Sequence, residues 1–251
     1  MMPVLGVVPA RLASTRLHRK PLQPLAGVPL VVRVAARVRE FGLLDELVVA
    51  TEAEEVAEVV RAAGFRVELT AAHHLTGTDR VAEVARRPPY ARFDTVVNIQ
   101  GDEPFLPAPA LAGALERLGQ GDDIGTAASP LAAAHAHDPS RVKVVTDLRG
   151  RALYFSRAVI PHDRDGDGSP PTVYWQHLGI YACRREALER WVSAAPTDLE
   201  MIERLEQLRA LQHGLTIGVA RLGAATLPGV DTPDDLMRAE AHWHATREEP
   251  A

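Results

Sequence analysis

The feature that most constrains this chain is a short apolar run near its start that opens directly into a basic loop. Residues 4–8 are apolar, and Pro9 ends the run because proline cannot donate a hydrogen bond to a sheet ladder. A basic loop that leaves a strand and enters a helix lies at the carboxyl end of a sheet, where open α/β folds bind nucleotides. A solvated surface loop is the alternative, but the sequence of strand, loop and helix favours a phosphate site. The loop's phosphate-gripping side chains are Arg11, Ser14, Thr15, Arg16 and Lys20.

Beyond this loop, short apolar runs alternate with stretches of helical period, which predicts an α/β fold with a mostly parallel central sheet flanked by helices. Predicted strands lie at 47–50, 67–69, 95–99, 124–129, 141–147, 152–155, 176–181 and 215–219. Predicted helices lie at 30–41, 56–63, around 81–85, and at 107–118, 184–192, 197–211 and from 232 onward.

Nothing in the composition separates two domains, so a single domain over residues 1–251 is expected. The polar stretch 161–171 is rich in glycine and proline, and is read equally well as a mobile lid or as a plain surface loop.

The overall composition excludes several classes of protein. A net charge of −5 argues against a general nucleic-acid binder, which needs a broad basic face. Cys183 is the single cysteine, so no internal disulfide framework is possible, and its apolar surroundings indicate a packed thiol rather than a nucleophile. No signal peptide precedes the first strand and no apolar run is long enough to span a membrane, so a cytoplasmic protein without membrane contact is expected.

Two aspartates follow apolar segments and are candidates for a metal site. Asp102 lies in a tight turn after the strand 95–99, and Asp231 precedes the last helix. Singly, each is better explained as a turn or capping residue. Together with a basic phosphate loop they favour Mg²⁺, which binds through one or two carboxylates and substrate phosphates.

Other polar residues give weaker signals. The segment 77–80 enters a helix that Thr78 could cap, with Arg80 after it. His177 lies among apolar residues and is first read as a core histidine. Three polar residues of the predicted helix 197–211 fall on one side, by the i, i+3, i+4 rule, and such a side usually faces solvent. They are Glu203, Glu206 and Gln207.

Taken together, these segments resemble the 3-deoxy-manno-octulosonate (Kdo) cytidylyltransferases over nearly the whole chain and in family order. The first segment alone would also suit other sugar nucleotidyltransferases. The matching segments are 8–22 (VPARLASTRLHRKPL), 97–104 (VNIQGDEP), 153–161 (LYFSRAVIP), 177–181 (HLGIY), 205–209 (LEQLR) and 229–233 (GVDTP).

The resemblance implies a Rossmann-like nucleotidyltransferase fold and a homodimer that uses Mg²⁺. The implied reaction couples CTP to Kdo, giving CMP-Kdo and diphosphate for lipopolysaccharide synthesis. Residues 1–130 would mainly bind the nucleotide, and residues 131–230 the sugar and the second subunit.

The resemblance also implies roles for individual residues. Arg11, Lys20, Asp102 and Asp231 would be catalytic, with the two aspartates holding the metal. The nucleotide would be bound by Arg11, Ser14, Lys20, Thr78, Arg80 and Gln100. The sugar would be bound by Gln100, Arg157, Arg164, His177, Tyr181, Glu203, Glu206 and Gln207.

The chain departs from the family pattern at four places. The usual Leu-Pro-Gly-Lys-Pro is here LHRKP at 17–21, and a common arginine of the base-binding segment is replaced by Ala71. The usual Trp-Asp-Arg begins with His162, and Gln176 stands where an arginine is often found. These changes leave open the details of cytosine recognition and the exact acid sugar.

Three alternatives therefore remain: a cytidylyltransferase for 8-amino-Kdo or a sialic acid, a glycosyltransferase that consumes a nucleotide sugar, and a non-catalytic nucleotide-binding module. The basic loop through Lys20 argues against a glycosyltransferase, because such an enzyme needs no grip on a leaving diphosphate.

Overall fold

The structure is a computed structural model and describes residues 3–14, 16–164 and 174–248. The chain divides into two compact units, of which the first comprises residues 1–106 and 227–251 and the second residues 107–226. The chain thus leaves the first unit after Leu106 and returns to it at Leu227, so the first unit contains both ends.

The first unit is built on a parallel sheet. Its central strand β1 has Leu5, Val7 and Val8 fully buried, which accounts for the continuous apolar run at the start of the sequence. The strands have the order β5-β4-β1-β6, with every pair parallel. They are β1 (Val4–Pro9), β4 (Glu46–Thr51), β5 (Arg66–Leu69) and β6 (Thr95–Ile99), all at predicted positions.

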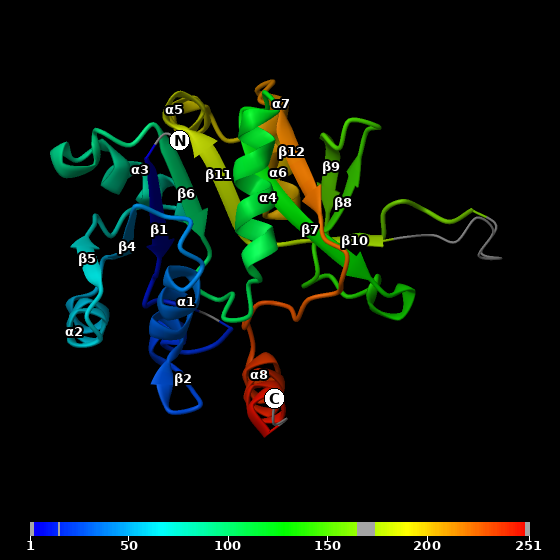
Figure 1. Cartoon of the computed structure of the whole chain (residues 1–251). Helices are drawn as coiled ribbons and strands as arrows, with labels where there is room; N and C mark the ends of the chain where they lie inside the picture. Colours follow the sequence, from blue (N-terminus) through cyan, green and yellow to red (C-terminus); the bar gives the residue numbers. More distant parts are fainter. Residues whose placement is uncertain (1–2, 15, 165–173, 249–251) are drawn as a thin grey trace. The chain divides into compact units, whose positions relative to one another are not determined.

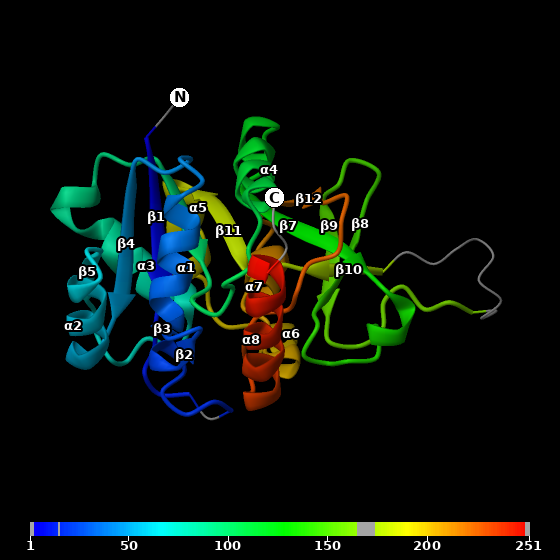
Figure 2. The ribbon, with the colours of Figure 1, turned by 60° about the horizontal axis from the view of Figure 1, so that its bottom comes forward.

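Helices cover both sides of this sheet, and α1 and α3 lie on opposite sides of β1 (Figures 1 and 2). This placement follows from right-handed crossovers, because the strand order steps one way from β1 to β5 and then back to β6. Gly64 has a positive φ of 76° and follows the C-cap of the second helix, while Gly42, with a φ of 65°, lies in the turn after the first. The helices are α1 (Leu30–Arg39), α2 (Glu54–Ala62), α3 (Gly77–Arg86) and α8 (Pro233–Glu248).

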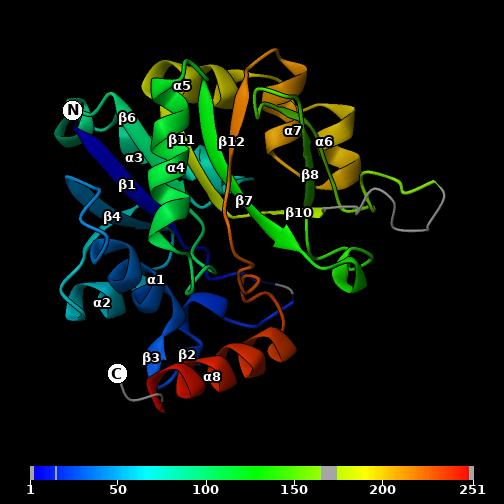
Figure 3. The same ribbon diagram turned by 45° about the vertical axis from the view of Figure 1, so that its right-hand side comes forward.

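A small hairpin that was not predicted follows the basic loop. Lys20–Leu22 form one 3₁₀ turn, and strands β2 (Pro24–Leu25) and β3 (Val28–Pro29) follow it. The hairpin lies beside α8 (Figure 3), where the Ala26 N–H donates to Glu240 at 2.7 Å. Leu25 of the hairpin and Ala239 of α8 belong to one buried apolar cluster. Its other buried members are Leu17, Leu30 and Val230.

The second unit has a mixed sheet centred on β7. Strand β12 pairs with β7 in parallel, whereas β10 and β11 run against it, and β8 and β9 extend the sheet from β10 as an antiparallel pair. The prediction of parallel strands thus holds for the first unit but not for most pairs here. Strands β8 and β9, for example, are joined by a tight turn at Gly150, which can connect only antiparallel strands. The strands are β7 (Ile124–Leu131), β8 (Lys143–Thr146), β9 (Ala152–Ser156), β10 (Tyr174–His177), β11 (Ile180–Arg184) and β12 (Ile217–Arg221).

Two predicted elements of the second unit are each divided in two. The predicted strand 176–181 is interrupted between β10 and β11, and the predicted helix 197–211 breaks at Arg204, whose φ is 55°. A capping box at Thr197 starts the first of the two helices. Helix α4 packs on β7, β11 and β12, while α7 packs on β9. The helices are α4 (Ala108–Gly119), α5 (Arg185–Ser193), α6 (Asp198–Glu203) and α7 (Gln207–Gln212).

Over the described residues, no helix combines the length and the apolarity needed to cross a bilayer. The proposed lid 161–171 lies outside the described residues from residue 165 onward.

Candidate functional site

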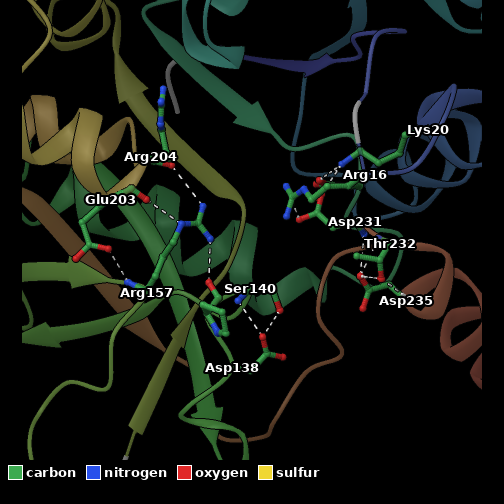
Figure 4. A network of polar contacts seen from close by, with 12 residues as sticks. Arg16, Lys20, Asp138, Ser140, Arg157, Glu203, Arg204, Asp231, Thr232 and Asp235 are labelled. Atoms are coloured by element: carbon green, nitrogen blue, oxygen red, sulfur yellow. Dashed lines mark hydrogen bonds and ion pairs between the residues drawn. The ribbon is translucent and has the colours of Figure 1, made fainter.

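In the first unit, the ammonium group of Lys20 lies between two carboxylates (Figure 4). Its Nζ donates to Oδ2 of Asp102 at 2.6 Å and to Oδ1 of Asp231 at 2.8 Å. The three residues come from three distant parts of the chain: the basic loop after β1, the turn after β6 and the segment before α8. The structure therefore brings together, at the carboxyl ends of parallel strands, residues that the sequence predicted to meet.

Backbone contacts explain why the two aspartates meet. A Cβ on Gly101 would lie 2.9 Å from the carbonyl oxygen of Pro9, so only glycine lets the Asp102 turn approach the end of β1 so closely. The carbonyl of Asp102 accepts a hydrogen bond from the N–H of Val230 at 2.8 Å, which aligns the Asp231 segment with this turn.

Asp231 is not the cap of the last helix. Thr232 and Asp235 cap α8 reciprocally: the Asp235 N–H donates to the Thr232 hydroxyl at 3.2 Å, and the Thr232 N–H to the Asp235 carboxylate at 2.9 Å. The carboxylate of Asp231 is thereby left for Lys20 and for Arg16, whose Nη2 lies 3.1 Å from Oδ2. Asp231 thus serves as a charged group facing the loop.

Charge and burial make this cluster suitable for a cation. The side chains of Lys20 and Asp102 are each 19% exposed and that of Asp231 27%. Burial lowers the pKa of Lys20, but the two carboxylates more than offset this, and the net pKa is raised above its ordinary value, so the ammonium stays charged.

Two hard oxygen donors converging on one point fit a divalent ion such as Mg²⁺. Among the described residues no group of three or more His, Cys, Asp or Glu could hold a metal. An ion held here would take its remaining ligands from water and from a bound phosphate.

The other residues of the basic loop are more exposed. Arg11 is exposed, and its Nε donates to the carbonyl of Ala13 at 3.1 Å, while Ser14 is half-buried. Thr15 lies outside the described residues. The start of the loop is fixed by Glu52, which accepts the N–H of Leu12 at 2.9 Å.

Thr78 and Arg80 are both buried, at 2% exposure each. The prediction that Thr78 caps its helix is wrong: Thr76 is the cap, in a capping box with Asp79. Thr78 instead accepts a hydrogen bond from Asn98 of β6 at 3.0 Å.

The guanidinium of Arg80 contacts the hydroxyl of Thr70, and its Nη2 lies 2.8 Å from Oε2 of Glu52. Burial lowers the pKa of Arg80, while Glu52 opposes that effect. Glu52 therefore links Arg80 to the basic loop at Leu12, a role that no motif in the sequence indicated. Gln100 is half-buried at the end of β6, where its carbonyl accepts the N–H of Glu103 at 3.3 Å.

In the second unit, His177 is a buried, neutral histidine. Burial lowers its pKa from 6.5 to about 3. The hydroxyl of Thr126 donates to the carbonyl of Ile180 at 2.6 Å, so it accepts from Nε2 of His177 at 2.9 Å, and the proton is assigned to Nε2. Nδ1 is then the acceptor nitrogen of the ring.

The ring of Tyr181 packs between those of His177 and Trp191. Its ring centroid lies 5.3 Å from that of His177 and 5.2 Å from that of Trp191. Burial, with the nearby Glu206 carboxylate, raises its pKa well above the ordinary value, so its hydroxyl keeps its proton. The backbone carbonyl of Glu206 accepts from the indole N–H of Trp191 at 3.1 Å, which fixes the start of α7.

Arg157 and Glu203 form a second cluster in this unit (Figure 4). The Glu203 carboxylate accepts the hydroxyl of Ser156 at 2.6 Å and the N–H of Arg157 at 2.9 Å. The Arg157 guanidinium donates to the carbonyls of Glu203 and Pro139, at 2.8 and 2.9 Å. Arg157 thus holds the backbone around it, and Arg164 is exposed.

The prediction that Glu203, Glu206 and Gln207 share one helix face is wrong, because the helix breaks between them. Glu203 ends α6, Glu206 precedes α7, and Gln207 opens it with 2% exposure. The left-handed residue Arg204 allows this break.

Two basic residues escaped prediction. Lys143 is fully buried and donates to the carbonyls of Asp138, Arg141 and Arg157, at 3.0, 2.6 and 2.6 Å. Arg141 donates to the side-chain oxygen of Gln176 at 3.0 Å. The sequence offered no signal for either, since each looks like an ordinary charge near a strand.

The chain is similar to known proteins over nearly its whole length. A family profile described as Cytidylyltransferase matches residues 5–217. The 3-deoxy-manno-octulosonate cytidylyltransferase of Gemmatimonas aurantiaca is 54% identical over 246 residues, covering 96% of this chain and 95% of that protein. The protein of the same name from Methylococcus capsulatus is 45% identical over 245 residues, covering 94% and 95%.

A solved structure of CMP:2-keto-3-deoxy-manno-octonic acid synthetase complexed with CTP matches with a TM-score of 0.88 at 36% identity, covering 97% of this chain and 99% of that one. The predicted nucleotidyltransferase fold is thereby confirmed. The chain belongs to the cytidylyltransferase family and, within it, to the 3-deoxy-manno-octulosonate cytidylyltransferases.

Proposed function

We propose that this protein is a nucleotidyltransferase that converts CTP and Kdo into CMP-Kdo and diphosphate, for lipopolysaccharide synthesis in the cytoplasm. The observation that carries the proposal is the convergence of Lys20, Asp102 and Asp231 in a chain of this family. A basic phosphate-binding loop beside two carboxylates suits the transfer of a nucleotidyl group from a triphosphate.

In the proposed reaction the anomeric hydroxyl of the sugar attacks the α-phosphorus of CTP. A bond forms between that oxygen and phosphorus, the hydroxyl loses its proton, and the bond to the leaving diphosphate breaks. Catalysis of this kind depends mainly on positioning and on neutralising charge.

Cytidylyltransferases commonly use a divalent metal. We assign Mg²⁺ here, with Asp102 and Asp231 as its protein ligands, because hard oxygen donors are what it prefers. When bound, it supplies charge neutralisation and lowers the pKa of the attacking hydroxyl. Lys20 and Arg11 hold the diphosphate as charge develops on it, with Ser14, Thr78, Arg80 and Gln100 completing the nucleotide site.

We propose that Gln100 and seven residues of the second unit, which are named below, bind the sugar. The neutral ring of His177 offers Nδ1 as an acceptor, and Tyr181 a hydroxyl that keeps its proton. Hydroxyl-rich ligands suit such groups, and Arg157 and Arg164 supply positive charge for a carboxylate. Glu203, Glu206 and Gln207 complete the proposed sugar site.

The test is diphosphate release across a panel of nucleotides and acid sugars, with Mg²⁺ present. Diphosphate should appear with CTP and Kdo together and not with either alone. Release with 8-amino-Kdo or a sialic acid in preference to Kdo would instead support the related cytidylyltransferase. Absence of release with every pair would exclude the reaction.

We also propose that the protein is a homodimer, as the family resemblance implies. Size-exclusion chromatography with light scattering tests this: twice the 27.2 kDa chain mass is expected, and a monomer at micromolar concentration would contradict it.

A further inference from the structure

The ammonium of Lys20 occupies the place between the two carboxylates that a metal ion would need. Its Nζ lies 2.6 Å from Oδ2 of Asp102 and 2.8 Å from Oδ1 of Asp231, and both are close, charge-assisted contacts. Figure 4 shows Lys20 beside Asp231. A magnesium ion binds carboxylate oxygens at about 2.0–2.1 Å, so an ion bound to these same oxygens would lie against the ammonium. Two like charges cannot share this position.

We propose that Lys20 is an internal cation that occupies the metal site until a nucleotide arrives and then exchanges places with the metal. This inference rests on the proposed function, since it takes the metal and the triphosphate as ligands of this site. An incoming triphosphate offers the ammonium a new anionic partner and offers the metal further oxygen ligands. Metal and nucleotide therefore bind cooperatively, and the coupling is the same in both directions.

The surroundings of Lys20 let the side chain move without the backbone. The turn that carries it is closed by hydrogen bonds from Leu22 N–H to the Arg19 carbonyl at 2.9 Å and from Gln23 N–H to the Lys20 carbonyl at 3.1 Å. Pro21 is buried beside it. Only the flexible four-carbon stem has to swing, and Arg16 can keep its contact with the other oxygen of Asp231.

The experiment measures Mn²⁺ binding to the whole chain without nucleotide, by calorimetry, for the natural protein and three variants. Lys20→Met removes the competing charge and keeps an apolar stem of similar length. It should bind Mn²⁺ roughly tenfold more tightly, within the usual range of coupling between two binding events. Adding CTP should strengthen Mn²⁺ binding more in the natural protein than in Lys20→Met.

Two controls make the result specific. Arg19→Met removes the positive charge of the residue next to Lys20 in the sequence. The Arg19 side chain pairs with Glu55 and not with the aspartates, so this variant should leave the Mn²⁺ affinity unchanged. Asp102→Asn removes a proposed ligand and should weaken binding. Far-ultraviolet circular dichroism verifies that each variant is folded.

The outcomes separate this inference from the proposed function. Mn²⁺ affinity in Lys20→Met equal to or below that of the natural protein, with weaker binding in Asp102→Asn, would overturn the exchange and leave the metal site standing. Unchanged affinity in Asp102→Asn would remove the metal assignment and the exchange with it. If Arg19→Met also bound Mn²⁺ more tightly, the gain in Lys20→Met would be explained by the loss of one positive charge in general, and the exchange would be overturned.

Discussion

Asp102 owes its position to the residues on either side of it. Gly101 permits close approach to the carbonyl of Pro9, and the Asp102 carbonyl is held by the N–H of Val230. The carboxylate is therefore fixed by backbone geometry, whereas Lys20, which it contacts, has a flexible side chain. A substitution of this carboxylate should change the chemistry of the site without displacing its backbone.

Asp102→Asn should lower the rate of diphosphate release by ~10²–10³ at saturating Mg²⁺, the usual effect of removing one essential electrostatic group. The amide keeps the shape of the side chain but loses its charge. The control is Asp94→Asn, which alters an exposed carboxylate just before β6, whereas Asp102 follows that strand. This variant should keep near-normal turnover. Near-normal turnover of Asp102→Asn would refute the assignment of this residue to the metal.

His177 makes stability depend on pH. Its pKa is lowered from 6.5 to about 3 by burial, so the unfolded chain binds a proton more readily than the folded one. The stabilisation is fully present above pH 6.5 and is lost as the pH falls toward 3. The expected slope for one such group is about 1.4 kcal/mol per pH unit.

Urea unfolding at pH 7 and pH 5 tests this. The natural protein should lose more stability than His177→Asn between these two values, by about 2 kcal/mol. His135→Asn, at an exposed position, should behave like the natural protein. Equal pH dependence in all three proteins would show that His177 is charged in the folded state.

Helices α6 and α7 are separated by a break at Arg204, and the three proposed sugar-binding residues Glu203, Glu206 and Gln207 lie on either side of it. A buried ion pair joins the two helices: Nε of Arg209 lies 2.7 Å from Oε2 of Glu200, and Nη2 lies 2.5 Å from Oε1. Both residues are less than a tenth exposed. Removing one partner of such a pair leaves the other charge buried and uncompensated.

Glu200→Gln should therefore lower the free energy of unfolding by about 3 kcal/mol. Because the turn between the helices relaxes, the KM for the acid sugar should rise while the KM for CTP stays the same. Glu186→Gln, an exposed substitution in α5, should change none of these quantities. Equal increases in both KM values would mean that the pair supports the fold in general and not the sugar site.

Helices and strands with a clear apolar period were predictable from the sequence, and β1, β4 and β6 are where the pattern put them. The hairpin β2–β3 was not, because its strands are two residues long and each contains a proline. The break at Arg204 was not either, because the apolar period continues through it and arginine gives no sign of a left-handed backbone.

For the whole molecule, the chain passes from the first unit to the second after Leu106 and back at Leu227. No linker composition marks either crossing, and the sequence predicts a single domain over residues 1–251. A short connection between two units has an ordinary composition and cannot be recognised in the sequence. Buried strands and helices and their caps can be recognised, because they require apolar periodicity and particular capping residues.

The candidate site was predictable to the extent that it depends on charged residues at strand ends. Lys20 and Asp102 meet because the parallel strands β1 and β6 present their carboxyl ends at one edge. Asp231 joins them because the N–H of Val230 donates to the carbonyl of Asp102. The roles of Arg80, Glu52 and Lys143 were not predictable, because each depends on contacts with groups distant in the sequence. Arg80 pairs with the Glu52 carboxylate, which accepts the N–H of Leu12, and Lys143 donates to the carbonyl of Arg157.

The most direct test of the central claim is a phosphorus NMR measurement of one reaction containing the protein, CTP, Kdo and Mg²⁺. We expect the triphosphate signals to be replaced by one phosphodiester signal of CMP-Kdo and by diphosphate, in equal amounts, and UTP in place of CTP to give little product. Formation of CMP or CDP without the phosphodiester, or no change in the CTP signals, would contradict it.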